Sequence, residues 1–460
     1  MSAVETEGGV TLQRAVVIGG SIAGLLTGQA LSAAFDEVVI IDRDDVDTTS
    51  TGVRRGVPQA RHPHTLLRRG EQILNTLFPG ITDDLIRHGA VVMPMGRVWW
   101  WQHRGYRAAV PDAAPIVSCS RPLLEFLVRE RVGGNGVVEL RTGEAVGLAG
   151  GDGAVGGVRV RDPSGGTTVL DAALVVDCSG RRSRADHWLT ELGHPCPDVQ
   201  LVQSDVRYTT RVFHRSASVR SDGAAGYFVI SHPRARKRFG TAMPIEGDRW
   251  IITLAGLHGE GAPADLAGYL SWARTLPTAK IASIVEDERP IGAAVRHRLP
   301  GSEWRLYHRL AAHPRGFVCV GDSVCSLNAL YGQGMTSAAV QVVALQQALA
   351  RCDVMAPEFA RTFYRLSARA VSPAWATAAG ADFVYPETRG HRPWPTKMIN
   401  RYVTRCVVAG QHDPAVATRL WDVANMVASP ASLLSPPALA RMVRNSRRRP
   451  LRNSAPSMPR

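Results

Sequence analysis

Continuous apolar runs form the first regular elements that the chain predicts. Residues 14–18 (RAVVI) and 37–42 (EVVIID) show no polar alternation, which is typical of strands buried on both faces of a parallel sheet. Between them lie a glycine turn at 19–24 and the segment 25–35 (LLTGQALSAAF), whose apolar residues share one helical face. A strand, a turn, a helix and a second strand in this order predict a βαβ unit.

Two further buried strands are predicted later in the chain. Residues 173–180 (ALVVDCSG) form a third apolar run that ends in a turn, and they follow a helix at 120–132 (SRPLLEFLVRERV) with a stripe of leucine and valine. Residues 317–322 (FVCVGD) form a fourth run, and the turn at 332–334 opens another helix. These elements have the style of the first βαβ unit and are expected in the same domain.

Between these segments the pattern changes to alternation. From about 200 to 260, apolar and polar residues alternate, as in GYFVI, FGTAMPI and RWIITLAGL, which is typical of an antiparallel sheet with one covered face. Residues 356–445 have mostly helical periodicity, interrupted by a stretch rich in Pro and Arg at 385–395. The fold class predicted is therefore α/β, with a Rossmann-type domain, an antiparallel-sheet domain and a helical C-terminal region.

The length and composition suit a large folded core. The chain has 460 residues, of which 45% are apolar and 20% are charged, a balance typical of folded rather than disordered proteins. It has no run of eighteen apolar residues, so we expect no membrane span. The segment 1–14 has no apolar core and carries two glutamates, so we expect no signal peptide and a cytoplasmic protein.

The formal charge of +14 is concentrated at one end of the chain. Seven arginines and no acid lie between 441 and 460. Such a tail is either a nucleic-acid arm or a solvated flexible terminus, and its lack of aromatic residues for base stacking favours the second interpretation. The seven cysteines form no C-x-x-C pair and no zinc spacing. We therefore expect small buried thiols and no metal site.

The turn at 19–24 (GGSIAG) has a G-x-G-x-x-G frame with serine at the second glycine position. Gly19 permits the tight turn, Gly24 lets the helix pack on the strand, and the small Ser21 lets the backbone approach a pyrophosphate. Asp42 ends the second strand, where a carboxylate binds a ribose hydroxyl. A structural turn without a ligand is the alternative. The expected dinucleotide contacts are Gly19, Gly20, Ser21, Ile22, Ala23, Gly24, Asp42 and Arg43.

The second glycine turn distinguishes FAD from NAD, because the first site suits either. No phosphate-binding arginine stands in the place of Asp42, so adenosine is expected there. Gly321 and Asp322 at a strand end would put a carboxylate on the ribityl hydroxyls of FAD. The helix that begins at 332–336 would point its N-terminal amides at the flavin, where negative charge collects on reduction. The two turns therefore predict two ends of one FAD.

Three motifs in this order resemble the signatures of the FAD-dependent aromatic hydroxylase class, to which para-hydroxybenzoate hydroxylase and squalene epoxidase belong. They are GGSIAG with Asp42, DCSGRRSR at 177–184, and GD at 321–322 followed by YGQGM at 331–335. The resemblance covers residues 14–350. It implies further FAD contacts at Arg121, Asp177, Gly180, Gly321, Asp322, Gly334 and Met335.

A narrower resemblance is to bacterial flavin epoxidases that act on polyene precursors of polyether ionophores. It rests on GVPQARHPH at 56–64, WQHR at 101–104, MPIEGDRWIITLAG at 243–256 and NALYGQGM at 328–335. Ala329 stands where those relatives have proline. The aromatic run at 99–101 is either core or pocket, and alternation puts its first and third members on one face. The substrate contacts expected are Trp99, Trp101, Gln102, His103 and Tyr331.

The resemblance implies an FAD-dependent monooxygenase that inserts one oxygen atom from O₂ by way of a flavin C4a-hydroperoxide. We expect it to epoxidise a carbon–carbon double bond of a lipophilic polyketide or terpenoid in natural-product biosynthesis. An alkene needs no protein base, whereas a phenol does, and no acid–base pair stands out in the sequence. The reductant expected is NAD(P)H, used directly or through a flavin reductase. The candidates near the flavin ring are Gly332, Gln333, Gly334 and Met335.

Three alternatives stay open. The same scaffold serves aromatic hydroxylases and flavin halogenases, although the W-x-W-x-I-P segment of the halogenases is missing. A dinucleotide-binding regulator that uses the basic tail on nucleic acid is the third hypothesis.

His62 and His64 are more consistent with hydrogen bonding at the surface or to FAD than with a metal, because they have no clustered acid or cysteine.

The domain boundaries predicted follow from the changes of pattern. A discontinuous FAD-binding domain is expected at 1–75, 116–190 and 285–355. A substrate-binding domain at 76–115 and 191–284, a helical C-terminal region at 356–445 and a basic flexible tail at 446–460 complete the division.

Overall fold

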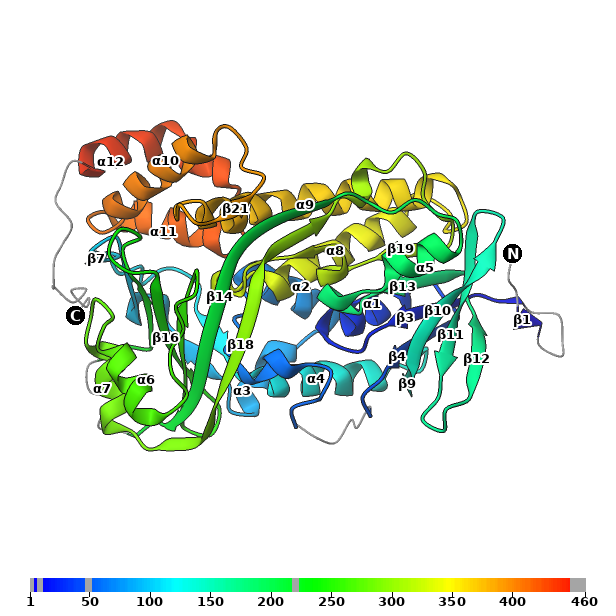
Figure 1. Ribbon diagram of the computed structural model, residues 1–460, viewed down its shortest axis with the longest axis horizontal. Coiled ribbons are helices and arrows are strands. Elements are labelled where there is room, and N and C mark those ends of the chain that lie inside the picture. The colour runs from blue at the N-terminus through cyan, green and yellow to red at the C-terminus, as the bar shows by residue number, and fades with distance from the viewer. Residues whose placement is uncertain (1–3, 6–10, 46–51, 217–222, 447–460) are drawn as a thin grey trace.

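The computed structural model describes residues 4–5, 11–45, 52–216 and 223–446. Within these residues, a parallel sheet with its helices forms one end of the molecule, and a large, mainly antiparallel sheet extends to the other end (Figure 1). A group of C-terminal helices lies over the far end of the large sheet. The basic tail expected at 446–460 falls, from 447 onward, outside the described residues.

The parallel sheet contains the apolar runs of the sequence. Its strands have the order β19-β13-β3-β4-β9, and every neighbouring pair is parallel. The central strands are almost wholly buried because helices cover the sheet, which explains why their sequences do not alternate. This arrangement confirms the α/β fold class. The strands are β3 (Arg14–Ile18), β4 (Glu37–Asp42), β9 (Val138–Thr142), β13 (Leu174–Asp177) and β19 (Phe317–Cys319).

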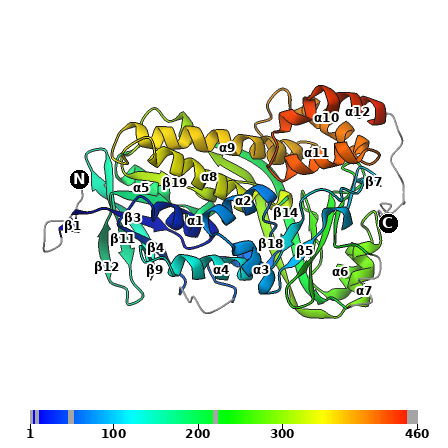
Figure 2. The ribbon, with the colours of Figure 1, turned by 180° about the vertical axis from the view of Figure 1, so that it is seen from behind.

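Helices α1 and α8 begin at the glycine turns of the sequence and pack against each other. Helix α4 contacts α1 from the other side. A small antiparallel sheet of β10, β11 and β12 lies beside the end of the parallel sheet near the N-terminus (Figure 2). The elements of this part are α1 (Ile22–Leu31), α2 (Arg68–Leu77), α3 (Ile81–Arg87), α4 (Arg121–Gly133), α5 (Ala185–Glu191), α8 (Gly334–Leu349), β1 (Val4–Glu5), β2 (Thr11–Leu12), β10 (Glu144–Gly151), β11 (Ala154–Arg161) and β12 (Thr167–Asp171).

The large sheet has the order β20-β18-β14-β17-β16-β15-β6-β7, with β21 added beside β14. Strands β14 and β18 are sixteen residues long each and connect the two ends of the molecule (Figure 1). The antiparallel pairing of β14 to β17 confirms the sheet expected between 200 and 260. The strands are β6 (Val98–Gln102), β7 (Gly105–Tyr106), β14 (Val199–His214), β15 (Gly226–Ile230), β16 (Arg238–Ile245), β17 (Arg249–Gly256), β18 (Pro290–Arg305), β20 (Cys325–Ser326) and β21 (Arg389–Gly390).

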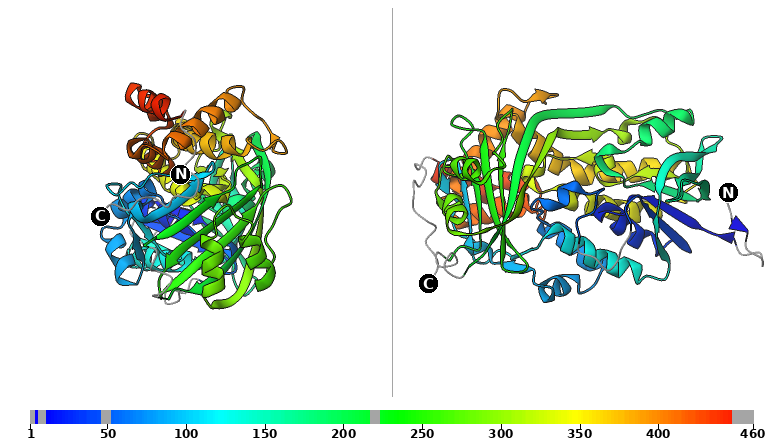
Figure 3. Two further views of the ribbon diagram at one scale, coloured as in Figure 1. Left: turned by 90° about the vertical axis from the view of Figure 1, so that its left-hand side faces the viewer. Right: turned by 60° about the horizontal axis from the view of Figure 1, so that its bottom comes forward.

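Two layers cover the large sheet. Helices α6 and α7 pack on one face and form a second apolar core with Trp250 and Tyr269. The C-terminal helices lie over the other side, and α9 runs along α8 from the parallel sheet toward them (Figure 3). The remaining elements are α6 (Leu266–Ala273), α7 (Lys280–Asp287), α9 (Glu358–Asp382), α10 (Thr396–Ala409), α11 (Pro414–Ala424), α12 (Pro436–Ser446), β5 (Val91–Met93) and β8 (Ile116–Ser118). Among the residues described, no helix combines the length and apolar character that crossing a membrane requires.

Candidate functional site

A cavity of about 1590 Å³ extends from the first glycine turn to the C-terminal helices. It is lined by the parallel sheet's loops, by one face of the large sheet and by α10 and α11. Sites for a single small molecule have volumes of about 300–1,000 Å³. The cavity therefore has room for a dinucleotide and a second molecule together.

The first glycine turn has the backbone that its sequence predicts. Gly19 has φ +103°, and a Cβ there would lie 2.7 Å from the carbonyl oxygen of Cys178. A Cβ on Gly24 would lie 1.7 Å from the carbonyl oxygen of Gly19, so only glycine lets α1 pack this closely on the strand. Ser21 precedes α1 but makes no capping hydrogen bond, and the first turn of α1 has no acid. The N-terminal amides of α1 therefore remain available to an anion.

Asp42 lies at the end of β4 and fixes this turn. Its Oδ2 accepts a hydrogen bond of 2.6 Å from the amide of Gly20, and its Oδ1 accepts one of 2.9 Å from the amide of Asp44. Arg54 contributes an ion pair of 3.1 Å to Asp42 and donates to the carbonyl oxygen of Gly20 at 3.0 Å. The carboxylate therefore stands at the end of β4 as predicted, but it is paired with Arg54, which the sequence did not indicate.

Glu125 of α4 belongs to the same network of hydrogen bonds and ion pairs around the first glycine turn. The hydroxyl of Ser21 donates to its Oε1 at 2.5 Å, Arg121 donates to the same oxygen at 2.8 Å, and Arg54 lies 3.5 Å from its Oε2. Burial opposes the charge of Glu125, but Arg121 and Arg54 outweigh it and lower its pKa to about 2. The sequence analysis missed Glu125 and Arg54. The (i, i+4) spacing of Arg121 and Glu125 on a helix was the available signal for the first.

The second glycine turn meets the first at the cavity. Gly321 has φ +75°, and a Cβ there would lie 2.9 Å from the Cβ of Ala23. The meeting follows from the sheet order, because β19 and β3 are the two parallel neighbours of β13. The turns that follow these two strands therefore leave the sheet at the same edge. Asp322 lines the cavity, and its burial raises its pKa while Arg181 opposes that shift. The structure therefore brings the two turns into one site, as the sequence predicts.

The turn before α8 is held from the helix α9. Asp382 is fully buried, accepts two hydrogen bonds of 3.0 Å from Asn328 and accepts one of 2.8 Å from the hydroxyl of Tyr331. Gly332 has φ +64°, and α8 begins at Gly334 with no acid in its first turn. The sequence analysis missed Asp382. Gly332, Gln333, Gly334, Met335 and Tyr331 all line the cavity.

Histidines 62 and 64 line the cavity. His62 bonds Thr210 of the large sheet at 2.7 Å, and its ring packs edge-on against Tyr208. Burial lowers the pKa of His62 to about 3, so the ring is neutral, and its Nε2 has no hydrogen-bond partner among the described residues. Burial and Arg121 lower the pKa of His64 to about 4. His62 is therefore a buried polar group on the wall of the large sheet.

Most expected contacts line the cavity, but several do not. Those that do are Gly19, Ser21, Ile22, Ala23, Asp42, Arg43, Arg121, Gly180, Asp322, Gly334, Met335, Gln102 and Tyr331. Asp177 is fully buried away from it and instead bonds the amide of Ser179 and the hydroxyl of Ser183. Gly20, Gly24 and Gly321 do not line the cavity, but a Cβ on any of them would come within about 3.0 Å of neighbouring atoms of the turns.

The expected placement of Trp99, Trp101 and His103 at the cavity is wrong. Trp99 and Trp101 do share one face of β6, but that face packs on the second apolar core against Tyr106. His103 sits in the β6–β7 turn and contacts His232. The cavity is lined instead by Trp100, on the opposite face of the strand.

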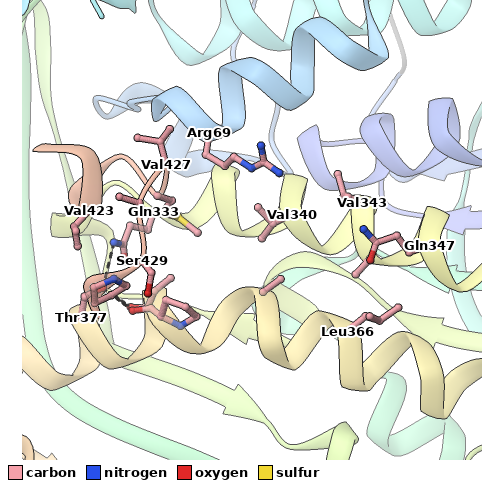
Figure 4. A pocket seen from close by; sticks show the side chains of 17 residues that line it. Arg69, Gln333, Val340, Val343, Gln347, Leu366, Thr377, Val423, Val427 and Ser429 are labelled. Carbon is pink, nitrogen blue, oxygen red and sulfur yellow. Dashed lines mark hydrogen bonds between the residues drawn. The ribbon is translucent and has the colours of Figure 1, made fainter. Parts of the chain in front are cut away.

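A second cavity of about 320 Å³ lies behind α8 (Figure 4). It is lined by α8, α9 and the segment 423–430, and it shares Gln333 with the main cavity. Gln333 donates to Thr377 at 3.4 Å, while its Oε1 is buried without a partner among the described residues. Gln333 therefore has an unused acceptor at the turn where the two cavities meet.

No group of three or more potential metal-ligating side chains occurs in the described part of the chain. The seven cysteines are free, and four of them are buried. Burial raises the pKa of the Cys178 and Cys319 thiols.

Comparison with solved structures finds the same fold in flavin-dependent enzymes. The flavin-dependent brominase Bmp2 matches 93% of this chain and 97% of its own with a TM-score of 0.62 at 16% identity. p-Nitrophenol 4-monooxygenase PnpA from Pseudomonas putida DLL-E4 matches 90% and 98% with a TM-score of 0.62 at 18% identity. The flavin-dependent halogenase CmlS matches 95% and 78% with a TM-score of 0.64 at 17% identity. At these identities the likeness concerns the fold.

A scan against models of known protein families gives no match. Among curated proteins, Protein Rv3254 of Mycobacterium tuberculosis (strain ATCC 25618 / H37Rv) is 31% identical over 394 residues, which cover 81% of this chain and 80% of the relative. Identity at this level over most of both chains establishes common descent. The chain belongs to the same family as Protein Rv3254.

Proposed function

We propose that the protein is an FAD-dependent monooxygenase. The observation that carries the proposal is the meeting of two glycine turns, at the ends of β3 and β19, on one cavity of about 1590 Å³. NAD would occupy the first turn only, whereas FAD extends from one turn to the other. The names of the structural neighbours, which include a monooxygenase, a brominase and a halogenase, support the same class.

The residues fit FAD along the length of the cavity. Asp42 would hold the adenosine ribose, and the amides of Ile22 and Ala23 with Arg121 would hold the pyrophosphate. Asp322 would hold the ribityl chain, and the turn 332–335 would face the ring. When bound and reduced, FAD would supply the activation of O₂. NADH or NADPH, or a separate flavin reductase, would supply the electrons.

The chain's own residues orient the second molecule and stabilise charge. The N-terminus of α8 has unpaired amides and no acid in its first turn, so it would favour negative charge on a ring bound at 332–335. Phe228, Val229, Met243 and Trp100 make the wall on the large sheet apolar, so it excludes water. A wall of this kind suits a lipophilic alkene, and we propose epoxidation of its double bond.

Aromatic hydroxylation is the second candidate because of His62. Its neutral imidazole lines the cavity with a free nitrogen, and Tyr208 and His297 lie beside it. Such a group can accept a hydrogen bond from the hydroxyl of a phenol and so orient its ring. An alkene has no hydroxyl to place there.

The test is oxygen transfer under ¹⁸O₂ with the purified protein, FAD and NADPH or NADH. Two substrates are compared, the lipophilic polyene alcohol all-trans-retinol and 2-naphthol. Label in an epoxide of retinol supports epoxidation, and label in the naphthol ring alone supports hydroxylation. Added bromide that yields a brominated naphthol would favour halogenation. A protein that binds no flavin, judged by its visible spectrum, would overturn the proposal.

A further inference from the structure

Arg107 lines the cavity at the place where the large sheet meets the C-terminal helices. It directly follows β7, and its amide donates to the carbonyl oxygen of Trp100 at 2.9 Å. The amide of the next residue, Ala108, donates to the carbonyl oxygen of Gly410 between α10 and α11 at 2.9 Å. Backbone hydrogen bonds therefore fix Arg107 from both sides.

The guanidinium of Arg107 has no carboxylate partner among the described residues. It lies 3.8 Å from the ring centre of Trp100, and its Nη2 donates to Oε1 of Gln102 at 2.7 Å. Its Nε and Nη1 are buried and make no hydrogen bond. Burial lowers its pKa to about 9, with no acid contributing, so the group is a cation at neutral pH. The nearby imidazole of His103 has its pKa lowered to about 4 by burial and His232, so it is neutral.

These contacts leave the cation poorly compensated. Removing a guanidinium from water costs several kcal/mol, whereas stacking on an aromatic ring returns about 0.5–2 kcal/mol and one neutral hydrogen bond returns about 1 kcal/mol. Elsewhere in the same cavity the buried arginines have acids, as Arg121 has Glu125. Arg107 is arranged to receive a negative charge that the chain does not provide.

The cavity continues from Arg107 along an apolar path to the turn before α8. Trp100 stacks on Phe228 with ring centres 5.2 Å apart and meets Trp421 edge-on at 5.7 Å. Trp100, Phe228 and Met243 belong to one apolar cluster, and the hydroxyl of Thr65 lies 3.7 Å from the Met243 sulfur. Thr65 in turn adjoins Gly332. A molecule held at Arg107 would therefore extend toward the proposed flavin ring.

We infer that Arg107 binds the carboxylate of the substrate, so that the substrate is a lipophilic acid whose apolar body lies along Trp100, Phe228 and Met243. This inference rests on the proposed function, and it adds the substrate's charge and its direction in the cavity. The planar fork of a guanidinium matches a carboxylate, and one cation balances one negative charge. A phosphate monoester, with up to two charges, is the less balanced partner.

The test measures binding of all-trans-retinoic acid and all-trans-retinol, two polyenes of equal length that differ in the anionic end. Quenching of tryptophan fluorescence at pH 7.5 is titrated with the protein as purified. Wild type is expected to bind the acid roughly 10- to 150-fold more tightly, the range for a charge-assisted pair. Arg107→Met should abolish this preference and keep the affinity for retinol, while Arg107→Lys should keep part of it.

The matched control is Arg104→Met, which removes the same charge from an exposed residue in the adjacent turn and should leave the preference intact. Retained affinity for retinol shows that the Arg107→Met variant is folded. Equal binding of the two probes by wild type, no binding of the acid, or an unchanged preference in Arg107→Met would overturn the inference. Stronger displacement of retinoic acid by dodecyl phosphate than by dodecanoic acid would overturn the carboxylate assignment. The flavin spectrum of the same samples reports separately on the proposed function.

Discussion

Replacing Glu125 by glutamine removes the negative charge beneath the first glycine turn and leaves the shape of the side chain. Glu125 has a side chain that is 5% exposed, and it faces Arg121, Arg54 and the hydroxyl of Ser21. After the substitution Arg54 keeps its pair with Asp42, but Arg121 loses its carboxylate. The variant therefore tests whether this ion network stabilises the turn.

The magnitude follows from the pKa of Glu125, which falls from 4.5 to about 2 on folding. A shift of this size corresponds to about 3 kcal/mol in favour of the folded state, similar to the roughly 3–5 kcal/mol lost when one partner of a buried pair is removed. Because the folded pKa is the lower one, this stabilisation is complete above about pH 4.5. It is lost as the pH falls toward 2.

The assay is thermal unfolding of the flavin-free protein, followed by circular dichroism between pH 6 and 8. At roughly 1 °C for each kcal/mol in a chain of 460 residues, Glu125→Gln should lower the Tm by about 3 °C, and by the same amount across this pH range. Glu130→Gln, on the exposed side of the same helix, is the control and should change the Tm little. A Glu125→Gln shift no larger than that of the control, or a shift that varies between pH 6 and 8, would refute the reasoning.

Three further predictions concern the cavity. Gly24→Ala places a Cβ 1.7 Å from a backbone oxygen, so FAD titration should show loss of most flavin binding. Asp322→Ala should lower flavin affinity more than Asp42→Ala, since Asp322 would hold the ribityl chain near the proposed ring, whereas the wild-type Asp42 carboxylate is already paired with Arg54; a lost charge-assisted bond corresponds to about 1.5–3 kcal/mol. Trp100→Ala should weaken binding of all-trans-retinol with little loss of Tm, whereas Trp101→Ala, in the second core, should lose about 3–5 kcal/mol of stability.

Each of these predictions has a control or a contrary outcome. Gly136→Ala, where a Cβ meets nothing within 4 Å, should bind FAD as wild type does. Wild-type affinity in the Asp322 variant would contradict the ribityl assignment. Equal retinol affinity in the Trp100 variant and wild type would contradict the position of the apolar wall.

Local patterns in the sequence were enough to predict the parallel sheet and both glycine turns. The central strands β3, β4 and β13 have no polar residue in their interiors, and glycines 19 and 24 occupy places where a Cβ has no room. No local sequence pattern indicates that Ala23 approaches Gly321. Their approach was predicted only from the requirement that FAD contact two separate regions of the chain. The domain boundaries and the roles of the individual contacts stay predictions.

The rest depended on tertiary contacts that no local pattern encodes. Alternation correctly put Trp99 and Trp101 on one face, but the sequence VWWWQ has large aromatic rings on both faces and gives no polar side to mark the outside. Arg54 pairs with Asp42 and lies near Glu125 only in the folded chain. Arg107 could not be singled out from the sequence, because the inference depends on the lack of a carboxylate beside its guanidinium among the described residues.

The sheet order has a consequence for the folding of the chain on the ribosome. Strand β13 is complete early in synthesis, but its outer neighbour β19 follows only after strands β14 to β18 of the large sheet have been made. Until then β13 is an unprotected edge with free backbone donors and acceptors, the kind of edge that pairs with other chains. A late-arriving parallel strand also makes folding slow. The nascent protein is therefore expected to need chaperone protection of this edge, and truncation before β19 should give aggregates rather than a smaller folded domain.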